Sequence, residues 1–548
     1  MSAAIGLDPH HPVHHPDHMV GEVRSGVPVT GRSLGAGISR GATSGGSLSA
    51  VILAAFLIDS GAAMAADASA TFRVGFAERE ITPEIGMEVP GGYSKAFCRE
   101  IHDPCKVRAV VFDDGKTRIA LVSIDGGFVF RPEVQRARAE IQRRCGIPPD
   151  AVLIAATHSH SSGPLGIVQP GEYDHASPEV QRLAYEESSC ADPGYLNMVF
   201  ERTVAAVCAA DEGRADARAG VGKGLAEKVA FCRRLRMKGG HTFTHPGQGN
   251  PDALDYAAPG DPEVGVLGVW NGEGKLLGCV VNFACHATTS PKGISANYVY
   301  YLEKVIRGFY GGGVIIIFLP GYSGDMTQVD NLSPYANPDG DRWAQIVGGQ
   351  IGAEALKVLL KIQPGALLPL EARSRVLEIP RRVPRPERVE AAYAVIRKEP
   401  KETNPTTWAF AKEIVLLNAL LEKAPRAEVE VQAIQVGPAV FLTSPGEMFC
   451  EYQLEEKKKS PFPLTFCVSV ANGFNGYVPT AEAFASTGGG YETRLTSCSN
   501  LEVGAGGKMV GAGLELAAKM RPGEVSQRPA APAYRQPWSY GNVPPELD

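Results

Sequence analysis

The sequence predicts an α/β domain with a mixed or parallel sheet, whose functional groups lie beyond the carboxyl ends of its strands. Residues 107–125, VRAVVFDDGKTRIALVSID, contain two runs of β-forming residues around an Asp-Gly turn, which is a hairpin signal. Residues 131–146, RPEVQRARAEIQRRCG, follow with helical spacing and a glycine stop. The apolar run 151–157, AVLIAAT, then completes a strand, helix and strand unit, which is typical of a parallel sheet.

Further strands and helices continue along the chain. We expect strands at KLLGCVVNFAC (275–285), GGVIIIFLP (312–320), AVFLTS (439–444) and LTFCVSVAN (464–472). We expect helices at NYVYYLEKVIRGFY (297–310), RWAQIVGGQIGAEALKVLLKI (342–362) and TTWAFAKEIVLLNALLEKA (406–424). The proline-rich stretch 379–390 predicts a connection between lobes. The glycine-rich stretch 504–513 predicts the entry to the last helix.

Composition divides the chain into three parts. Residues 1–65 are a disordered leader followed by a signal peptide, because a short apolar run ends in Ala63-Met64-Ala65 and predicts cleavage before Ala66. We expect residues 70–522 to form one folded domain, and residues 523–548 to form a proline-rich extended tail. We therefore expect an exported protein that is periplasmic or secreted.

Charge and cysteine content narrow the function. The chain has 60 acidic and 54 basic residues, a net charge of -6, and so lacks the basic excess of nucleic-acid-binding proteins. All eleven cysteines follow the signal segment, and Cys98 with Cys105 form the best local candidate for a disulfide. The absence of a CxxC pair argues against a zinc ribbon or a thioredoxin-type site.

Chemically active side chains follow four predicted strands. His158 comes after AVLIAAT, His286 after CVVNFAC, Glu447 after AVFLTSPG, and Tyr477 lies in the segment after FCVSVA. If the chain stays extended, His158 and His160 face the same way. Two neutral imidazoles and one carboxylate can hold a catalytic zinc ion with one position open for water. The alternative is a pair of histidines bonded to loop backbone.

Several ordered motifs carry a resemblance to a known family. THSHSSGP (157–164) is similar to the Thr-His-Thr-His-Ser-Gly-Pro signature of the neutral/alkaline, non-lysosomal ceramidases. The segments REITPEIGMEVPGGY (79–93), NFACHATT (282–289), SPGEMF (444–449) and ANGFNGYVPT (471–480) resemble further segments of that family, in the same order. The resemblance covers about residues 72 to 520, nearly all of the mature chain, and implies that residues 70–522 are a ceramidase-like catalytic domain.

The resemblance implies one zinc ion per chain, held by four side chains. The matching positions are His158, His286, Glu447 and Tyr477. A phenolate ligand is physically reasonable, because a divalent ion lowers the pKa of an acid that coordinates it. The alternative for Tyr477 is a buried ring whose hydroxyl bonds to a loop.

The resemblance also implies a set of catalytic side chains. His160 matches a histidine that acts beside the metal, and Arg233 matches an arginine near the scissile carbonyl. Asp325 and Thr327 lie in GYSGDMTQVD (321–330), which aligns with the family's Gly-Asp-x-Ser-Pro. We expect Asp325 to orient a group at the site and Thr327 to stand where the family has its nucleophilic serine. The alternative for Arg233 is a solvated position on a strand.

The sequence departs from the family pattern at two places. The loop after His160 is one residue longer, with Ser161 and Ser162, and Thr327 replaces the serine. These changes keep zinc chemistry but place the ceramide substrate in doubt. We therefore expect a zinc-dependent hydrolase of N-acyl amide bonds, ceramidase-like, that converts N-acylsphingosine to sphingosine and fatty acid and makes peripheral contact with a membrane. The alternatives are a zinc amidase or esterase for a non-sphingolipid substrate and a non-catalytic exported binding protein.

Overall fold

The computed structural model describes residues 71–338, 340–398 and 402–548. The chain divides into two units, Met1–Ala66 and Asp67–Asp548, and all that follows concerns the second. The predicted leader and signal peptide lie outside the described residues. Among the residues that are described, no helix is both long enough and apolar enough to cross a membrane.

The larger of two main sheets has eight strands. They are β1 (Arg73–Glu80), β2 (Lys106–Asp113), β3 (Arg118–Ile124), β4 (Val152–Ala156), β5 (Ala215–Leu225), β10 (Glu263–Asn271), β11 (Leu276–Phe283) and β12 (Ile315–Pro320). Their order across the sheet is β12-β11-β10-β5-β1-β2-β3-β4. The pairs β3–β4 and β11–β12 are parallel and the other pairs are antiparallel, so the predicted mixed sheet is confirmed.

The hairpin, helix and strand predicted between residues 107 and 157 form as the sequence indicates. Strands β2 and β3 pair in an antiparallel hairpin, and Gly115 in the turn has a left-handed φ of 84°. Helix α1 (Arg131–Cys145) has a proline in its first turn and ends at Gly146, whose φ of 70° suits a helix C-terminus. Strand β4 then pairs with β3 in parallel.

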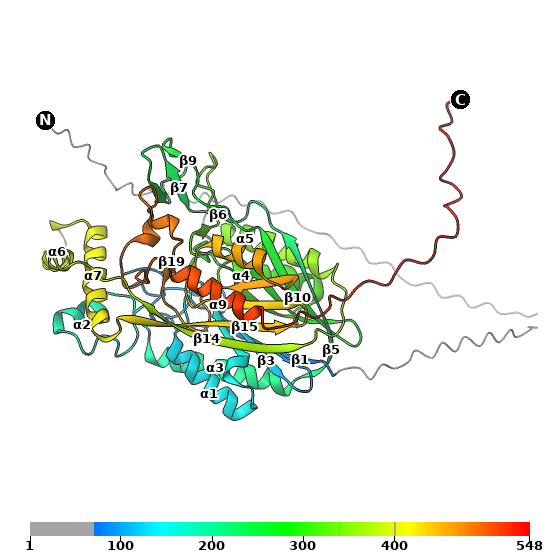
Figure 1. Ribbon diagram of the computed structural model, residues 1–548, viewed down its shortest axis with the longest axis horizontal. Coiled ribbons are helices and arrows are strands. Elements are labelled where there is room, and N and C mark those ends of the chain that lie inside the picture. Colours follow the sequence, from blue (N-terminus) through cyan, green and yellow to red (C-terminus); the bar gives the residue numbers. More distant parts are fainter. Residues whose placement is uncertain (1–70, 339, 399–401) are drawn as a thin grey trace, which may run out of the picture. The chain divides into compact units, whose positions relative to one another are not determined.

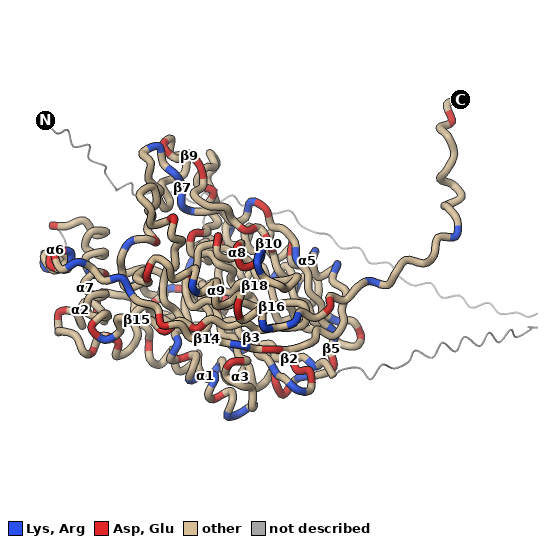
Figure 2. The backbone as a smooth tube through the Cα atoms, viewed as in Figure 1, with Lys and Arg blue, Asp and Glu red and all other residues tan. Residues whose placement is uncertain are grey.

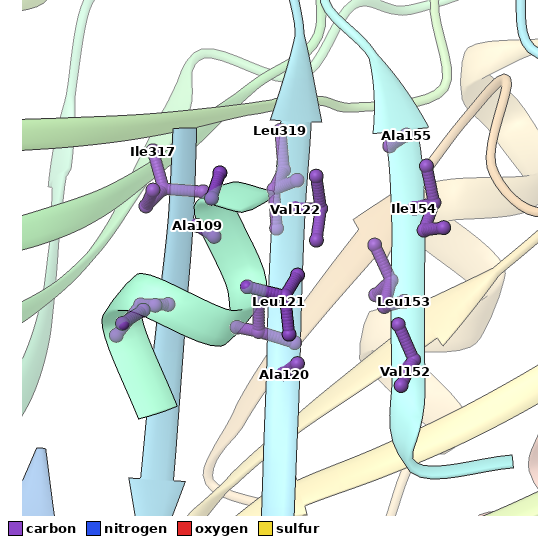
Figure 3. Close-up of a cluster of buried hydrophobic side chains, with 14 of the residues drawn as sticks. Ala109, Ala120, Leu121, Val122, Val152, Leu153, Ile154, Ala155, Ile317 and Leu319 are labelled. Atoms are coloured by element: carbon purple, nitrogen blue, oxygen red, sulfur yellow. The ribbon is translucent and has the colours of Figure 1, made fainter. Parts of the chain in front are cut away.

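The main core lies where strands far apart in the sequence pack together. Figure 3 shows Ile317 and Leu319 of β12 beside Ala109 of β2 and Leu121 of β3, all of them buried. Helix α3 (Pro193–Glu212) lies against strands β1, β2 and β3, and α1 packs against α3 (Figure 1). Helices α4 (Tyr298–Tyr310) and α5 (Gly340–Leu359) pack together, and α5 covers β5 and β10.

The second main sheet has four strands. They are β14 (Leu370–Pro380), β15 (Arg426–Val436), β16 (Ala439–Thr443) and β18 (Leu464–Val468). Helices α8 (Cys450–Lys459) and α9 (Ala505–Ala517) pack on it, and α9 begins in the predicted glycine-rich stretch. The proline-rich segment 379–390 is only partly a connection, because Pro386 starts helix α6 (Pro386–Ile396). Helix α6 packs against α7 (Pro405–Lys423), which also contacts α2 (Pro178–Tyr185).

Short elements surround the ends of these sheets. The short strands are β6 (Phe231–Cys232), β7 (Arg234–Met237), β8 (Thr242–Thr244), β9 (Ala253–Tyr256), β13 (Met326–Thr327), β17 (Glu447–Met448) and β19 (Tyr477–Val478). The short 3-10 helices are η1 (Pro149–Ala151), η3 (Glu482–Phe484) and η4 (Tyr491–Thr493). From residue 523 onward the chain forms no helix or strand and is mostly exposed.

The structure decides the disulfide prediction. The predicted Cys98–Cys105 disulfide is wrong in this structure, because all eleven cysteines are free thiols. Cys98 instead donates from Sγ to the carbonyl of Glu100, and burial raises the pKa of Cys105 well above its ordinary value. Figure 2 shows acidic and basic residues interspersed over the described chain.

Candidate metal centre

The two histidine segments lie side by side at one end of the larger sheet. His158 follows β4, His286 follows β11, and a parallel bridge joins Ser159 to Ala287. The backbone N–H of His160 donates to the Ala287 carbonyl at 3.2 Å. These backbone contacts hold the imidazoles of two distant segments together.

The expected extended conformation after β4 is wrong in detail. His158 has a φ of 65°, in the left-handed region, so the strand ends at Ala156 and the chain turns sharply. The rings of His158 and His160 nevertheless meet, with centroids 4.8 Å apart, and the rings of His158 and His286 are 4.6 Å apart. The turn therefore brings the histidines together where strand alternation does not.

The carboxylate and the phenol lie in segments that follow strands of the second sheet. Glu447 lies in β17, after β16, and Tyr477 lies in β19, after β18. These two short strands pair in parallel with Glu447 directly opposite Tyr477. All four predicted ligand positions thus lie in segments that follow strands, two after strands of the larger sheet and two after strands of the second sheet.

Distances between side-chain atoms define a compact donor group. Oε2 of Glu447 lies 3.3 Å from Nε2 of His158 and 3.1 Å from Nε2 of His286. The opposite ring nitrogens are held by backbone, since Nδ1 of His158 lies 2.9 Å from the Gly127 carbonyl and Nδ1 of His286 lies 2.6 Å from the Ser323 carbonyl. An Nδ1–H that donates to a carbonyl leaves the Nε2 lone pair directed at the centre.

The donor group fits a divalent cation. His158, His286 and Glu447 are at most 4% exposed. Nε2 of His158, Nε2 of His160 and Oε2 of Glu447 are buried and have no hydrogen-bond partner. Buried polar atoms normally find partners, so several unpaired acceptors aimed at one point are the arrangement that a metal ion satisfies. Imidazole nitrogens and a carboxylate oxygen are also ligand types that catalytic zinc sites use.

The three histidines form a group in their own right. One ligand atom from each of His158, His160 and His286 lies within 4.8 Å of the others. The prediction placed His160 beside the metal, and the geometry also allows it as a ligand. Its Nδ1 lies 3.3 Å from the Gly91 carbonyl, which leaves Nε2 for a proton or a metal.

Neighbouring charges set the ionisation of the donor group. Burial alone would raise the pKa of Glu447, but the His158 and His286 rings hold it well below its usual range. Burial and the nearby Arg233 guanidinium lower the pKa of His286 to about 4. Burial and the other two rings lower the pKa of His160 well below its ordinary value. The centre therefore presents Glu447 as an ionised carboxylate and His160 and His286 as neutral imidazoles, which are the ligand forms of both groups.

Arg233 lies beside this centre between β6 and β7, and its solvated alternative is wrong because its side chain is 8% exposed. Nη2 donates to the Gly324 carbonyl at 2.7 Å and to the Tyr477 hydroxyl at 3.2 Å. Nη1 lies 3.5 Å from Nε2 of His286. The guanidinium therefore touches two of the four predicted ligands.

Asp325 and Thr327 are both buried near the centre. Oδ1 of Asp325 accepts from the backbone N–H of Cys450 at 2.8 Å, at the start of α8, and its carbonyl accepts from the Arg233 backbone at 2.8 Å. Burial raises the pKa of Asp325 to about 6. The hydroxyl of Thr327 accepts from the Val329 N–H at 3.3 Å. Asp325 thus supports the loop whose Ser323 carbonyl orients His286.

Sequence reasoning missed several residues of the centre. Glu492 accepts from Nε of Arg233 at 2.6 Å, and the ring of Tyr491 lies 5.3 Å from that of Tyr477. Phe128 packs edge-on to His158 with ring centroids 5.7 Å apart. Glu492 and Tyr491 follow a glycine-rich stretch with no strand or helix pattern, so periodicity offers no signal for them.

Comparisons with known proteins agree with this geometry. No family model matches the chain. The curated neutral ceramidase of Pseudomonas aeruginosa is 25% identical over 333 residues, which is 58% of this chain and 46% of that relative. The crystal structure of neutral ceramidase from Pseudomonas aeruginosa matches with a TM-score of 0.61 and 18% identity, over 84% of this chain and 77% of that one. The chain has the neutral ceramidase fold.

A second solved structure supports the same assignment. A ceramidase complexed with C2 matches with a TM-score of 0.59 and 17% identity, over 85% of this chain and 78% of that one. The resemblance to the neutral ceramidase family that the ordered motifs predict is therefore confirmed. The sequence match spans less than half of the curated neutral ceramidase.

Proposed function

We propose that this protein is a zinc-dependent hydrolase that cleaves an N-acyl amide bond, as a ceramidase does. One observation carries the proposal: Oε2 of Glu447, a buried atom with no hydrogen-bond partner, lies within 3.3 Å of Nε2 of His158 and of Nε2 of His286. Its sequence relative is named a neutral ceramidase, and that name supports N-acylsphingosine as the substrate.

Four side chains are proposed to hold one zinc ion per chain, namely His158, His286, Glu447 and Tyr477. When bound at such a site, zinc polarises a carbonyl oxygen and makes hydroxide available near neutral pH. Burial and the Glu447 carboxylate raise the pKa of Tyr477 well above its ordinary value, so the protein groups alone keep this phenol protonated. Tyr477 therefore loses its proton only when a cation binds to its phenol oxygen.

The remaining residues have roles that follow from their contacts. Nη1 of Arg233 points toward the donor group and supplies N–H groups for charge that develops on a carbonyl oxygen. His160 is partly exposed, and its unpaired Nε2 is placed to move a proton to a leaving amine. Asp325 supports the loop that orients His286.

The second candidate function is a zinc amidase or esterase for a small non-sphingolipid substrate. Thr327 favours this candidate, because it replaces the serine of the ceramidase pattern at a buried position. A ceramide substrate would bring the protein into peripheral contact with a membrane. We also propose that the protein is exported, as the apolar segment before Ala66 predicts.

A hydrolysis assay with paired substrates tests the proposal. The purified chain is given a fluorescent ceramide or a short N-acyl amide, before chelation, after exhaustive chelation and after zinc is restored. We expect ceramide hydrolysis that is lost on chelation and returns with zinc. Hydrolysis of the short amide alone would favour the second candidate. Full rates after complete metal removal would contradict both.

A further inference from the structure

We propose that Glu492 is a positioning residue that fixes the Arg233 guanidinium and balances its charge beside the histidines. The inference rests on the proposed function, because that function assigns Arg233 the stabilisation of charge on a carbonyl oxygen at a zinc centre. Glu492 is fully buried, at 0% exposure, and lies in η4, far from Arg233 in the sequence.

Both carboxylate oxygens of Glu492 are engaged. Oε1 accepts from Nε of Arg233 at 2.6 Å, and Oε2 accepts from the Thr244 hydroxyl at 2.6 Å. The same Thr244 hydroxyl accepts from the backbone N–H of Tyr491 at 3.0 Å. The carboxylate is thus held by strand β8 as well as by its own segment, and its position fixes one edge of the guanidinium.

The contacts of Arg233 occupy Nε and Nη2 and leave Nη1 available to bind a substrate oxygen. Nε is bonded to Glu492, and Nη2 is bonded to the Gly324 carbonyl and the Tyr477 hydroxyl. Nη1 faces Nε2 of His286 at 3.5 Å. A ring nitrogen that coordinates a metal has no lone pair left to accept a hydrogen bond. With His286 bound to zinc, the N–H groups of Nη1 are therefore free for a substrate oxygen.

Glu492 also offsets the positive charge of the Arg233 guanidinium. A buried guanidinium next to His286 and a divalent cation raises the electrostatic energy of the bound cation, because like charges repel strongly where water is excluded. The ionised Glu492 carboxylate offsets that positive charge at 2.6 Å from Nε. Loss of the carboxylate charge is expected to weaken zinc binding and to release the guanidinium.

The test compares two variants with a control. Glu492→Gln keeps the shape and the bond to Thr244 but removes the charge, and Glu492→Asp keeps the charge on a shorter side chain. Glu482→Gln, at an exposed position in η3, is the control. Zinc affinity is measured by competition with a chelator of known affinity, and kcat and KM are measured on the substrate that the chain hydrolyses.

We expect Glu492→Gln to weaken zinc binding by about 10- to 100-fold and to lower kcat more than it raises KM. Glu492→Asp is expected to recover most of the zinc affinity but less of kcat, because the contact with Nε lengthens. Glu482→Gln should match the unmodified chain. Zinc affinity and kcat of a folded Glu492→Gln variant within about twofold of the unmodified chain would overturn the inference.

A spectroscopic readout separates this inference from the proposed function. The Nε–H signal of Arg233 in arginine-labelled protein, assigned by its loss in Arg233→Lys, should exchange slowly with solvent and become fast-exchanging in Glu492→Gln. If the unmodified chain binds no zinc and hydrolyses no amide, the proposed function fails, yet this signal still decides whether Glu492 holds Arg233. An unchanged signal in Glu492→Gln would contradict the positioning role.

Discussion

Glu447 and Tyr477 lie directly opposite each other in a parallel pair of two-residue strands, β17 and β19. The backbone N–H of Glu447 donates to the Gly476 carbonyl at 2.8 Å, so backbone hydrogen bonds fix the register of the two residues. Each residue follows a strand of the second sheet, whereas the histidines follow strands of the first. The candidate metal centre therefore joins the two sheets.

Removal of the negative charge of Glu447 should prevent zinc from binding at the centre. We expect Glu447→Gln to contain little zinc and to lose hydrolysis by at least about 100-fold, because an amide is a poor replacement for a carboxylate ligand. Zinc content is measured by atomic absorption on the purified chain. Glu451→Gln, in the first turn of α8, serves as the control. A Glu447→Gln variant with full zinc content would show that the carboxylate is no ligand.

The roles of His158 and His160 can be separated by metal content. His158→Asn should lose zinc, because His158 contributes one of the unpaired nitrogens next to Glu447. His160→Asn should keep zinc and lower kcat by about 10²- to 10⁴-fold, the usual cost of removing a group that transfers a proton. Equal zinc loss in both variants would instead make His160 a ligand.

Gly91 provides a probe of His160 that leaves the histidine itself unchanged. Gly91 has a φ of 134°, and a Cβ placed there would lie 3.1 Å from Nδ1 of His160. Gly91→Ala should displace the ring, lower kcat by roughly 10-fold and destabilise the fold by about 1 kcal/mol, with zinc retained. Gly92→Ala is the matched control, because a Cβ at Gly92 meets no atom within 4 Å. Equal kinetics of the two variants would count against a role for the His160 position.

The sequence predicts the scaffold of the site better than its details. Strand-end side chains such as His158, His286 and Glu447 are predictable, because apolar runs reveal strands and parallel strands collect functional groups at one edge. The close approach of Glu447 to both histidines is the geometry expected of three ligands to one ion. Which of the three histidines bind the ion stays a prediction.

Long-range contacts from irregular segments could not be predicted. Glu492 reaches Arg233 from a position 259 residues away, and Gly91 reaches His160 from a loop without regular structure. The Cys98–Cys105 prediction failed because closeness in sequence says nothing about the direction of buried side chains. Such contacts depend on how the loops pack, and no local pattern encodes that packing.

Glu456 provides a test of burial that is independent of catalysis. This residue of α8 is 1% exposed, its Oε2 has no hydrogen-bond partner, and burial raises its pKa from 4.5 to about 8. Between these two values the folded state keeps the carboxyl proton and the unfolded state releases it. The contribution of Glu456 to stability therefore falls as pH rises, by at most about 1.4 kcal/mol per pH unit.

We therefore expect Glu456→Gln to gain stability relative to the unmodified chain as pH rises from about 5 to about 8, since the amide does not titrate. The free energy of unfolding is measured in urea at several pH values. Glu455→Gln, whose carboxylate pairs with Lys459 on the surface, corrects for the general effect of removing a carboxylate from α8. A constant difference between Glu456→Gln and the unmodified chain across this range would contradict a raised pKa.

The most direct test of the central claim is anomalous X-ray diffraction from crystals of the zinc-loaded chain, measured above and below the zinc absorption edge. We predict one strong anomalous peak per chain, about 2.0 to 2.2 Å from Nε2 of His158, Nε2 of His286 and a carboxylate oxygen of Glu447. An anomalous map with no peak between these three side chains, or with zinc bound only elsewhere, would contradict the account.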